Sequence, residues 1–410
     1  MAQAVAGPAR RVLLALGSVL IVVLAAEILL AWLAPQIHQL PHVWEFDQTL
    51  GWRHRAGASG RLRTPEFDVP YQIDDAGRRI RRAATVPTSK APSNSVDPAA
   101  WADGIHEAIP GIQPDALEPP HDKHLRISLY GDSFAEGWGV EAEQSLAGQL
   151  ETTLRDRQVS ATVLNYGTAG YGTDQELLLY SSTGRSQDSD IVLVLFYGND
   201  LWNNSSRQAI GVERGDKPFF SIGRDGLLRL EGVPVRRHPT WDRRLAFSLV
   251  GSSHLASLVA ASLRPAEIPV AQQAAYYAGL YGADSSSMRT PQWELTCRLL
   301  KRFHDTVTAE GERCVVIYAP SVLQVEPEAW ASRRMLYGLD DEYDLMKPNQ
   351  TLAAWATEAD VPFLDLTPAF LQKQQGGTRL FYDDSHWRRA GHHLAAVETA
   401  AFLDSMNWLH

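Results

Sequence analysis

Apolar positions are distributed unevenly along this chain. Residues 12–34 form one almost unbroken apolar run, whereas residues 86–122 contain few large apolar side chains. From residue 125 onwards, short apolar runs alternate with longer stretches whose apolar residues recur with a period of about 3.6, as in an amphipathic helix. This pattern predicts an N-terminal membrane-length helix followed, after a break, by an α/β domain.

The alternation after residue 125 predicts a set of short strands and a set of helices between them. The predicted strands are Arg126–Tyr130, Ala161–Asn165, Ile191–Tyr197, Arg313–Tyr318 and Val361–Leu366. The predicted helices are Ala142–Arg155, Thr173–Ser181, Trp293–Ala309, Tyr343–Ala359 and Arg389–Met406. Nearly continuous apolar strands that alternate with amphipathic helices indicate a parallel sheet covered by helices on both faces.

We place this domain at residues 124–410. Two further segments are expected before it, and one is expected within it. In residues 36–85, short extended runs are broken by Gly and Pro, a pattern that predicts a small β-rich module. Residues 86–123 contain seven of the 23 prolines and predict a linker. Residues 205–290 interrupt the alternation and predict an insertion, with a hairpin in Pro218–Arg229.

The run from Val12 to Ala34 predicts a transmembrane helix. As a helix, its 23 residues would be about 35 Å long, enough to cross a hydrocarbon core of about 30 Å. Its fourteen Leu, Ile and Val residues outweigh the cost of the single charge, Glu27, which is roughly 2.5–3.5 kcal/mol at the membrane centre. We therefore expect residues 12–35 to be a membrane anchor.

Charge around the anchor predicts its orientation. Arg10 and Arg11 precede it, and the next arginine is Arg53, so the positive-inside rule places residues 1–11 in the cytoplasm. The rest of the protein would then lie outside a plasma (inner) membrane, in the periplasm of a bacterium with two membranes. A cleaved signal peptide ending at Val23-Leu24-Ala25 is the alternative, and it gives the same extracytoplasmic location.

Composition narrows the classes of function. The net charge of −10 and the absence of a basic cluster argue against nucleic acid as a partner. Two cysteines are too few for a disulfide framework or a four-thiolate zinc site. We expect them to be buried thiols or one local disulfide. No metal and no cofactor is predicted.

Polar residues with catalytic potential follow the predicted strands. Ser133 comes directly after the first strand, a Gly-rich loop follows the second, and Asn199 follows the third. Asp383 and His386 lie after the last strand, just before the final helix. Functional groups of parallel sheets collect at the carboxyl ends of the strands, so we expect these residues to meet there.

Together these residue types suit acyl transfer. A nucleophilic serine needs a nearby histidine as base, and the histidine needs a carboxylate to hold its tautomer. A glycine amide, an asparagine amide and the N–H of the serine itself can stabilise the oxyanion of the intermediate. Each motif alone is weak evidence, and it is the combination, in strand context, that favours a serine hydrolase.

The motifs resemble those of the SGNH (GDSL-type) hydrolase superfamily, and in particular of its bacterial membrane-anchored members. The resemblance covers about residues 125–403 without the insertion. It implies Ser133 as the nucleophile, Gly170 and Asn199 as oxyanion-hole residues, and Asp383 with His386 as the rest of a catalytic triad. The fold it implies is a three-layer α/β/α sandwich with a five-stranded parallel sheet.

Other interpretations of single residues remain open. Ser133 could act only as a helix N-cap, and Asp384 is an alternative to Asp383. His392 and His393 are expected to be packed or solvated, because they lack the spacing of a metal motif. Trp138 could line a sugar or acyl subsite or pack in the core.

The sequence predicts both a class of enzyme and a class of substrate. The motifs predict an extracytoplasmic serine esterase, and the compartment favours acetyl esters of a cell-envelope polysaccharide as its substrate. The alternatives are an O-acetyltransferase of such a polysaccharide, a lipid esterase or thioesterase, and a non-catalytic glycan-binding scaffold.

Overall fold

The computed structural model describes residues 6–34, 42–81, 124–183, 189–208, 216–236, 253–263, 270–282, 290–339 and 342–410. Two compact units emerge from its contacts. One comprises residues 1–41, 61–68 and 239–267, and the other comprises residues 42–60, 69–238 and 268–410. The predicted linker, residues 86–123, lies outside the described residues.

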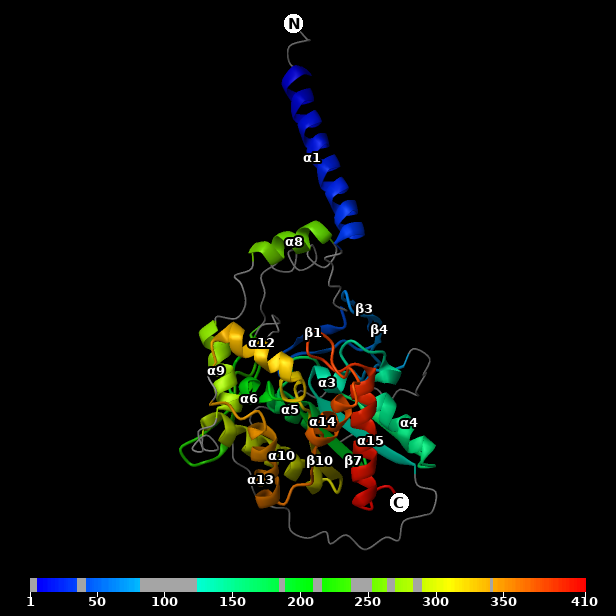
Figure 1. The fold of residues 1–410 in the computed structure, drawn as a ribbon, viewed down its shortest axis with the longest axis vertical. Coiled ribbons are helices and arrows are strands. Elements are labelled where there is room, and N and C mark those ends of the chain that lie inside the picture. Colours follow the sequence, from blue (N-terminus) through cyan, green and yellow to red (C-terminus); the bar gives the residue numbers. More distant parts are fainter. Residues whose placement is uncertain are drawn as a thin grey trace. The chain divides into compact units, whose positions relative to one another are not determined.

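A five-stranded parallel sheet forms the centre of the larger unit, as predicted (Figure 1). Its strands, in the order in which they pair, are β11 (Phe363–Asp365), β10 (Arg313–Tyr318), β7 (Ile191–Phe196), β5 (Leu125–Gly131) and β6 (Ala161–Asn165). Every neighbouring pair is parallel. The carboxyl ends of all five strands therefore point to the same edge, where the catalytic candidates follow them.

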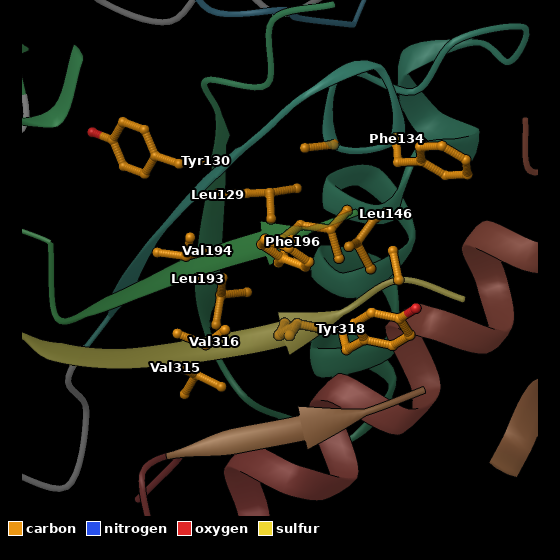
Figure 2. Close-up of a cluster of buried hydrophobic side chains, with 14 of the residues drawn as sticks. Leu129, Tyr130, Phe134, Leu146, Leu193, Val194, Phe196, Val315, Val316 and Tyr318 are labelled. Atoms are coloured by element: carbon orange, nitrogen blue, oxygen red, sulfur yellow. The ribbon is translucent and has the colours of Figure 1, made fainter. Parts of the chain in front are cut away.

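Helices cover both faces of the sheet, which makes the fold a three-layer sandwich. One layer contains α4 (Leu146–Asp156), α14 (Thr367–Gln375) and α15 (Arg389–Ser405). The other contains α5 (Thr173–Thr183), α10 (Pro291–Ala309) and α13 (Lys347–Ala359). Figure 2 shows apolar side chains of the three central strands, among them Leu129, Leu193 and Val316, gathered in the core between these layers.

Two predicted helices begin later than their apolar pattern. Ala142–Gln144 is a 3-10 turn, and α4 starts only after Ser145, whose side chain accepts a hydrogen bond from the Gly148 N–H at 3.3 Å. The helix predicted from Tyr343 begins at Lys347, with a proline in its first turn. The first start is set by a serine cap and the second coincides with a proline suited to the first turn, and apolar spacing reveals neither.

Shorter elements make up most of the rest of the described residues. Before the linker lie the antiparallel pairs β1 (Trp44–Asp47) with β2 (Gly51–His54) and β3 (Ser59–Arg63) with β4 (Asp68–Gln72). The insertion contains the predicted hairpin as β8 (Phe219–Ile222) and β9 (Leu228–Glu231). The remaining helices are α3 (Ser133–Glu136), α6 (Asp200–Asn203), α8 (His254–Leu263), α9 (Val270–Tyr281), α11 (Val322–Val325) and α12 (Pro327–Tyr337).

The N-terminal apolar run is one helix, α1 (Ala6–Leu33). Its segment from Arg10 to Leu33 is long and apolar enough to cross a membrane, although a signal sequence has the same properties. The two cysteines, Cys297 and Cys314, are free thiols.

Candidate active site

Ser133 is held at the carboxyl end of β5, where the chain turns abruptly into α3. The Asp132 side chain caps this short helix by accepting a hydrogen bond from the Phe134 N–H at 2.8 Å. Gly131 makes the turn possible, because a Cβ there would lie 2.9 Å from the Leu195 carbonyl oxygen. The Ser133 side chain is thereby fixed at the rim of the sheet, nearly buried, with 9% of the residue exposed.

His386 reaches Ser133 from the loop before α15. Its Nε2 atom lies 2.9 Å from Ser133 Oγ, within hydrogen-bond distance. Two aromatic rings flank the imidazole: the ring centroid of Phe134 is 5.2 Å away and that of Trp138 is 5.6 Å away. The structure therefore brings together a serine and a histidine in the arrangement needed for proton transfer between them.

Asp384 is the carboxylate next to this histidine. Its Oδ1 lies 3.2 Å from His386 Nδ1, although this pair lacks the alignment of a hydrogen bond. The same oxygen accepts the backbone N–H of His386 at 3.1 Å, and Oδ2 accepts the indole N–H of Trp138 at 3.2 Å. Burial raises the pKa of Asp384. The close imidazole of His386 and its charge, with the hydrogen bonds from the His386 N–H and from Trp138, lower the pKa below its ordinary value.

Asp383, the orienting carboxylate expected from the sequence, lies elsewhere. Its Oδ1 accepts a hydrogen bond from Arg379 at 2.9 Å, and its side chain is 76% exposed. In the structure, therefore, Asp383 is not the carboxylate beside the imidazole. The chain turns at Ser385, which has a positive φ of 75°, and it is the side chain of Asp384 that faces the imidazole.

The two other oxyanion candidates follow β6 and β7. Asn199 donates from Nδ2 to Asp132 Oδ2 at 3.0 Å, so its side-chain amide is tied to the residue next to Ser133. An amide nitrogen carries two N–H groups, and one is left for a ligand. Gly170 has a φ of +82°, a conformation that suits glycine.

Ala169, the residue before Gly170, is hydrogen-bonded on both sides. The Ala169 N–H donates to the Glu136 carboxylate at the end of α3. The Ala169 carbonyl oxygen accepts the indole N–H of Trp52, from β2, at 3.2 Å. The loop that carries the predicted oxyanion glycine is therefore fixed both to the nucleophile helix and to a strand that lies before the linker.

Arg79, which also precedes the linker, supports the loop after Ser133. Its guanidinium donates to the carbonyl oxygens of Glu136 at 2.7 Å, Gly137 at 2.5 Å and Val140 at 2.5 Å, and it lies over the ring of Tyr71. Sequence reasoning did not identify Arg79 or Trp52 as part of the site, because hydrogen bonds to carbonyl oxygens leave no sequence motif.

Buried acids lie beneath the site. Burial raises the pKa of Asp132 to about 6, against hydrogen bonds from Phe134 and Asn199 that lower it. Burial also raises the pKa of Asp200, whose Oδ2 accepts the Tyr197 N–H at 3.1 Å. Both acids thus organise the loops after their strands.

The described residues contain no group of three or more His, Cys, Asp or Glu side chains suited to a metal ion. His392 is buried against Trp387, with ring centroids 5.5 Å apart, and His393 contacts Gln149 Oε1 at 2.9 Å. These contacts agree with the packed or solvated roles expected for the two histidines.

Comparison with known proteins identifies one family. The model of the GDSL-like lipase/acylhydrolase family matches residues 129–394. No curated protein matches the chain.

Several solved structures are similar. A G-D-S-L lipolytic protein from Veillonella parvula is 11% identical, with 68% of this chain and 97% of that chain covered and a TM-score of 0.36. A lipase/acylhydrolase from Enterococcus faecalis is 13% identical, with 69% and 96% covered and a TM-score of 0.36. A catalytic mutant of an acetylxylan esterase from Geobacillus stearothermophilus is 12% identical, with 68% and 94% covered and a TM-score of 0.37.

Proposed function

The chain belongs to the GDSL-like lipase/acylhydrolase family, and from this premise we propose that it is a membrane-anchored, extracytoplasmic serine esterase with Ser133 as its nucleophile. The observation that carries the proposal is the distance of 2.9 Å between Ser133 Oγ and His386 Nε2. A serine at the start of a short helix, in contact with an imidazole nitrogen, is the arrangement that activates a hydroxyl.

The proposed reaction has two halves. Ser133 Oγ attacks the ester carbonyl while its proton passes to His386 Nε2. The tetrahedral intermediate then collapses, and His386 returns the proton to the departing alcohol, which leaves an acyl-Ser133. Water, deprotonated by His386, attacks this ester in the same way and releases the acid and the free serine.

Three groups would stabilise the oxyanion of each intermediate: the N–H of Ser133, the N–H of Gly170 and the side-chain amide of Asn199. Asp384 would hold the imidazole and stabilise its protonated form, the role that the sequence alone assigned to Asp383. The 3.2 Å approach of Asp384 Oδ1 to His386 Nδ1 supports this assignment, and such contacts often tighten when substrate binds.

We propose acetyl esters of a cell-envelope polysaccharide as the substrate. The rings beside His386 support a sugar-bearing substrate. The ring of Trp138 lies beside the imidazole in a tilted orientation, and Trp44 stacks on Trp138 with ring centroids 6.5 Å apart. Broad, partly exposed indole faces suit the apolar face of a sugar ring.

A fluorophosphonate probe and an acetyl-ester assay on the full-length protein test the enzyme. We expect covalent labelling and acetyl-ester hydrolysis, both lost in Ser133→Ala and both kept in Ser405→Ala, an exposed serine of α15. An unlabelled wild-type protein that hydrolyses no acetyl ester would contradict the proposal. Faster hydrolysis of octanoyl than of acetyl esters would contradict the acetyl assignment alone.

A C-terminal reporter tests the location. We expect a reporter that folds only outside the cytoplasm to be active when fused after His410. Activity of a reporter that works only in the cytoplasm would contradict the proposed orientation without affecting the chemistry.

A further inference from the structure

Glu27, the single charged residue of the apolar run, binds the start of α8. Its Oε1 accepts the His254 N–H at 2.6 Å. Its Oε2 accepts the Ser253 hydroxyl and the Leu255 N–H, both at 2.9 Å. The carboxylate therefore satisfies backbone donors that a helix start leaves open, and its negative charge faces the positive end of the helix dipole.

The composition of α8 is that of a lipid-facing helix. No charged residue occurs between Leu255 and Leu263. Leu258 and Val259 are 37% and 46% exposed, and the hydroxyl of Ser262 donates to the Leu258 carbonyl oxygen at 2.8 Å. The N–H groups of the first turn of α8 are bonded to Glu27, and the Ser262 hydroxyl is bonded within the helix. These groups therefore meet the condition that an apolar medium sets for polar groups.

The position of Glu27 sets the depth at which α8 starts. Glu27 lies six residues before Leu33, the last residue of α1, which corresponds to about 9 Å along the helix. Helices that lie in a membrane interface bury their apolar face by about 5–10 Å. α1 and α8 belong to the same compact unit and pack against each other (Figure 1).

We propose that α8 is a second membrane-bound element, an interfacial helix whose residues Leu258 and Val259 contact lipid acyl chains. This inference rests on the membrane anchor of the proposed function. The occupant of the exposed face is lipid because α8 packs against α1, whose own apolar side chains are exposed. Glu27 joins the two helices at the depth of the outer acyl-chain boundary.

Fluorescence quenching in vesicles tests the proposal with the full-length protein. In a Cys297→Ser background, an environment-sensitive dye is attached to Leu258→Cys, to Val19→Cys on α1, or to Met335→Cys, which is 85% exposed on the larger unit. The vesicles contain phosphatidylcholine and phosphatidylglycerol, with a nitroxide on a fraction of the acyl chains. We expect dyes at residues 19 and 258 to be quenched to within about twofold of each other, and the dye at residue 335 to remain unquenched.

The outcomes separate the two proposals. Quenching at residue 19 without quenching at residue 258 overturns the interfacial helix and leaves the anchor. An unquenched dye at residue 258 with a blue-shifted emission also overturns the interfacial helix, since protein and not lipid then covers the dye. No quenching at either position overturns the anchor itself.

A variant of Glu27 tests the link between the helices. We expect Glu27→Ala to reduce quenching at residue 258 by about twofold or more while quenching at residue 19 is unchanged, because α8 loses its cap. Unchanged quenching at residue 258 would overturn the role of Glu27.

Discussion

The indole N–H of Trp138 lies 3.2 Å from Oδ2 of Asp384, and the same indole ring flanks His386. Trp138 follows the nucleophile helix, whereas Asp384 and His386 belong to the loop before the last helix. One side chain thus connects the serine end of the site to its acid–base end. Predictions about the site follow from this connection.

Asp384 and Asp383 are adjacent carboxylates in different environments, and exchanging each for its amide separates their roles. We expect Asp384→Asn to lower kcat by roughly 10²–10⁴, because an amide neither stabilises the imidazolium nor fixes the right tautomer. Asp383→Asn, the matched control, should change kcat by less than about threefold, because the ion pair with Arg379 that it weakens is exposed. Steady-state kinetics on an acetyl ester provides the measurement, and the reverse order would return the role to Asp383.

Trp138→Phe keeps an aromatic ring beside His386 but removes the donor to Asp384. We expect kcat to fall by about tenfold, the effect of losing one hydrogen bond to a charged group, and KM to change less. Trp138→Ala should lower kcat further because the ring is lost as well. A Phe variant with wild-type kcat would show that the indole N–H does not position the carboxylate.

Asn199→Ala tests the oxyanion hole. Removing one donor from such a hole lowers kcat by roughly 10²–10³, and we expect that loss here. Circular dichroism should show an unchanged fold, since Asn199 is only partly buried. A loss of less than about threefold, in the presence of a native fold, would remove Asn199 from this role.

Arg79→Met tests the support of the nucleophile loop. Three carbonyl oxygens would lose their common donor, and each unsatisfied buried group costs about 1–3 kcal/mol. We expect urea unfolding to show a loss of at least about 2 kcal/mol. Arg53→Met, which removes exposed ion pairs to Glu45 and Asp47, should cost less than about 1 kcal/mol. Equal losses in the two variants would argue against the support by Arg79.

The raised pKa of Asp132 predicts that the free energy of unfolding depends on pH. Its pKa is raised from 3.8 to about 6 in the folded protein, so the native state holds this proton more tightly than the unfolded state does. Its contribution to stability is fully present below pH 3.8 and is lost as the pH rises through about 6. We therefore expect the free energy of unfolding of wild type, relative to Asp132→Asn, to decrease between about pH 4 and pH 7. A pH-independent difference would contradict the raised pKa.

The sequence predicted the sheet well because each buried strand carries its own apolar signature. Ile191–Phe196 is buried at every position, and such a run has few alternatives to a central parallel strand. The contact between Ser133 and His386 was also predictable, since both follow strands of the same sheet.

Which of two adjacent carboxylates lies beside the imidazole was not predictable in the same way. Asp383 and Asp384 are neighbours, and only the backbone turn at Ser385 determines which side chain reaches the imidazole. The roles of Arg79 and Trp52 depend on tertiary contacts to backbone carbonyl oxygens, for which many donors would serve. Glu27 illustrates the same limit, because its partner at α8 is more than 200 positions away.

The hydrogen bonds of Trp52 and Arg79 also determine what counts as the minimal enzyme. The family match begins at residue 129, and a truncation designed from it would discard both side chains. Such a fragment would keep Ser133, His386 and Asp384 and yet lack the donors that hold the Ala169 peptide and the loop after α3. A form of this hydrolase without α1 should therefore begin at about residue 42. A protease cut between residues 82 and 123 would yield two pieces that complete one active site only while they stay together.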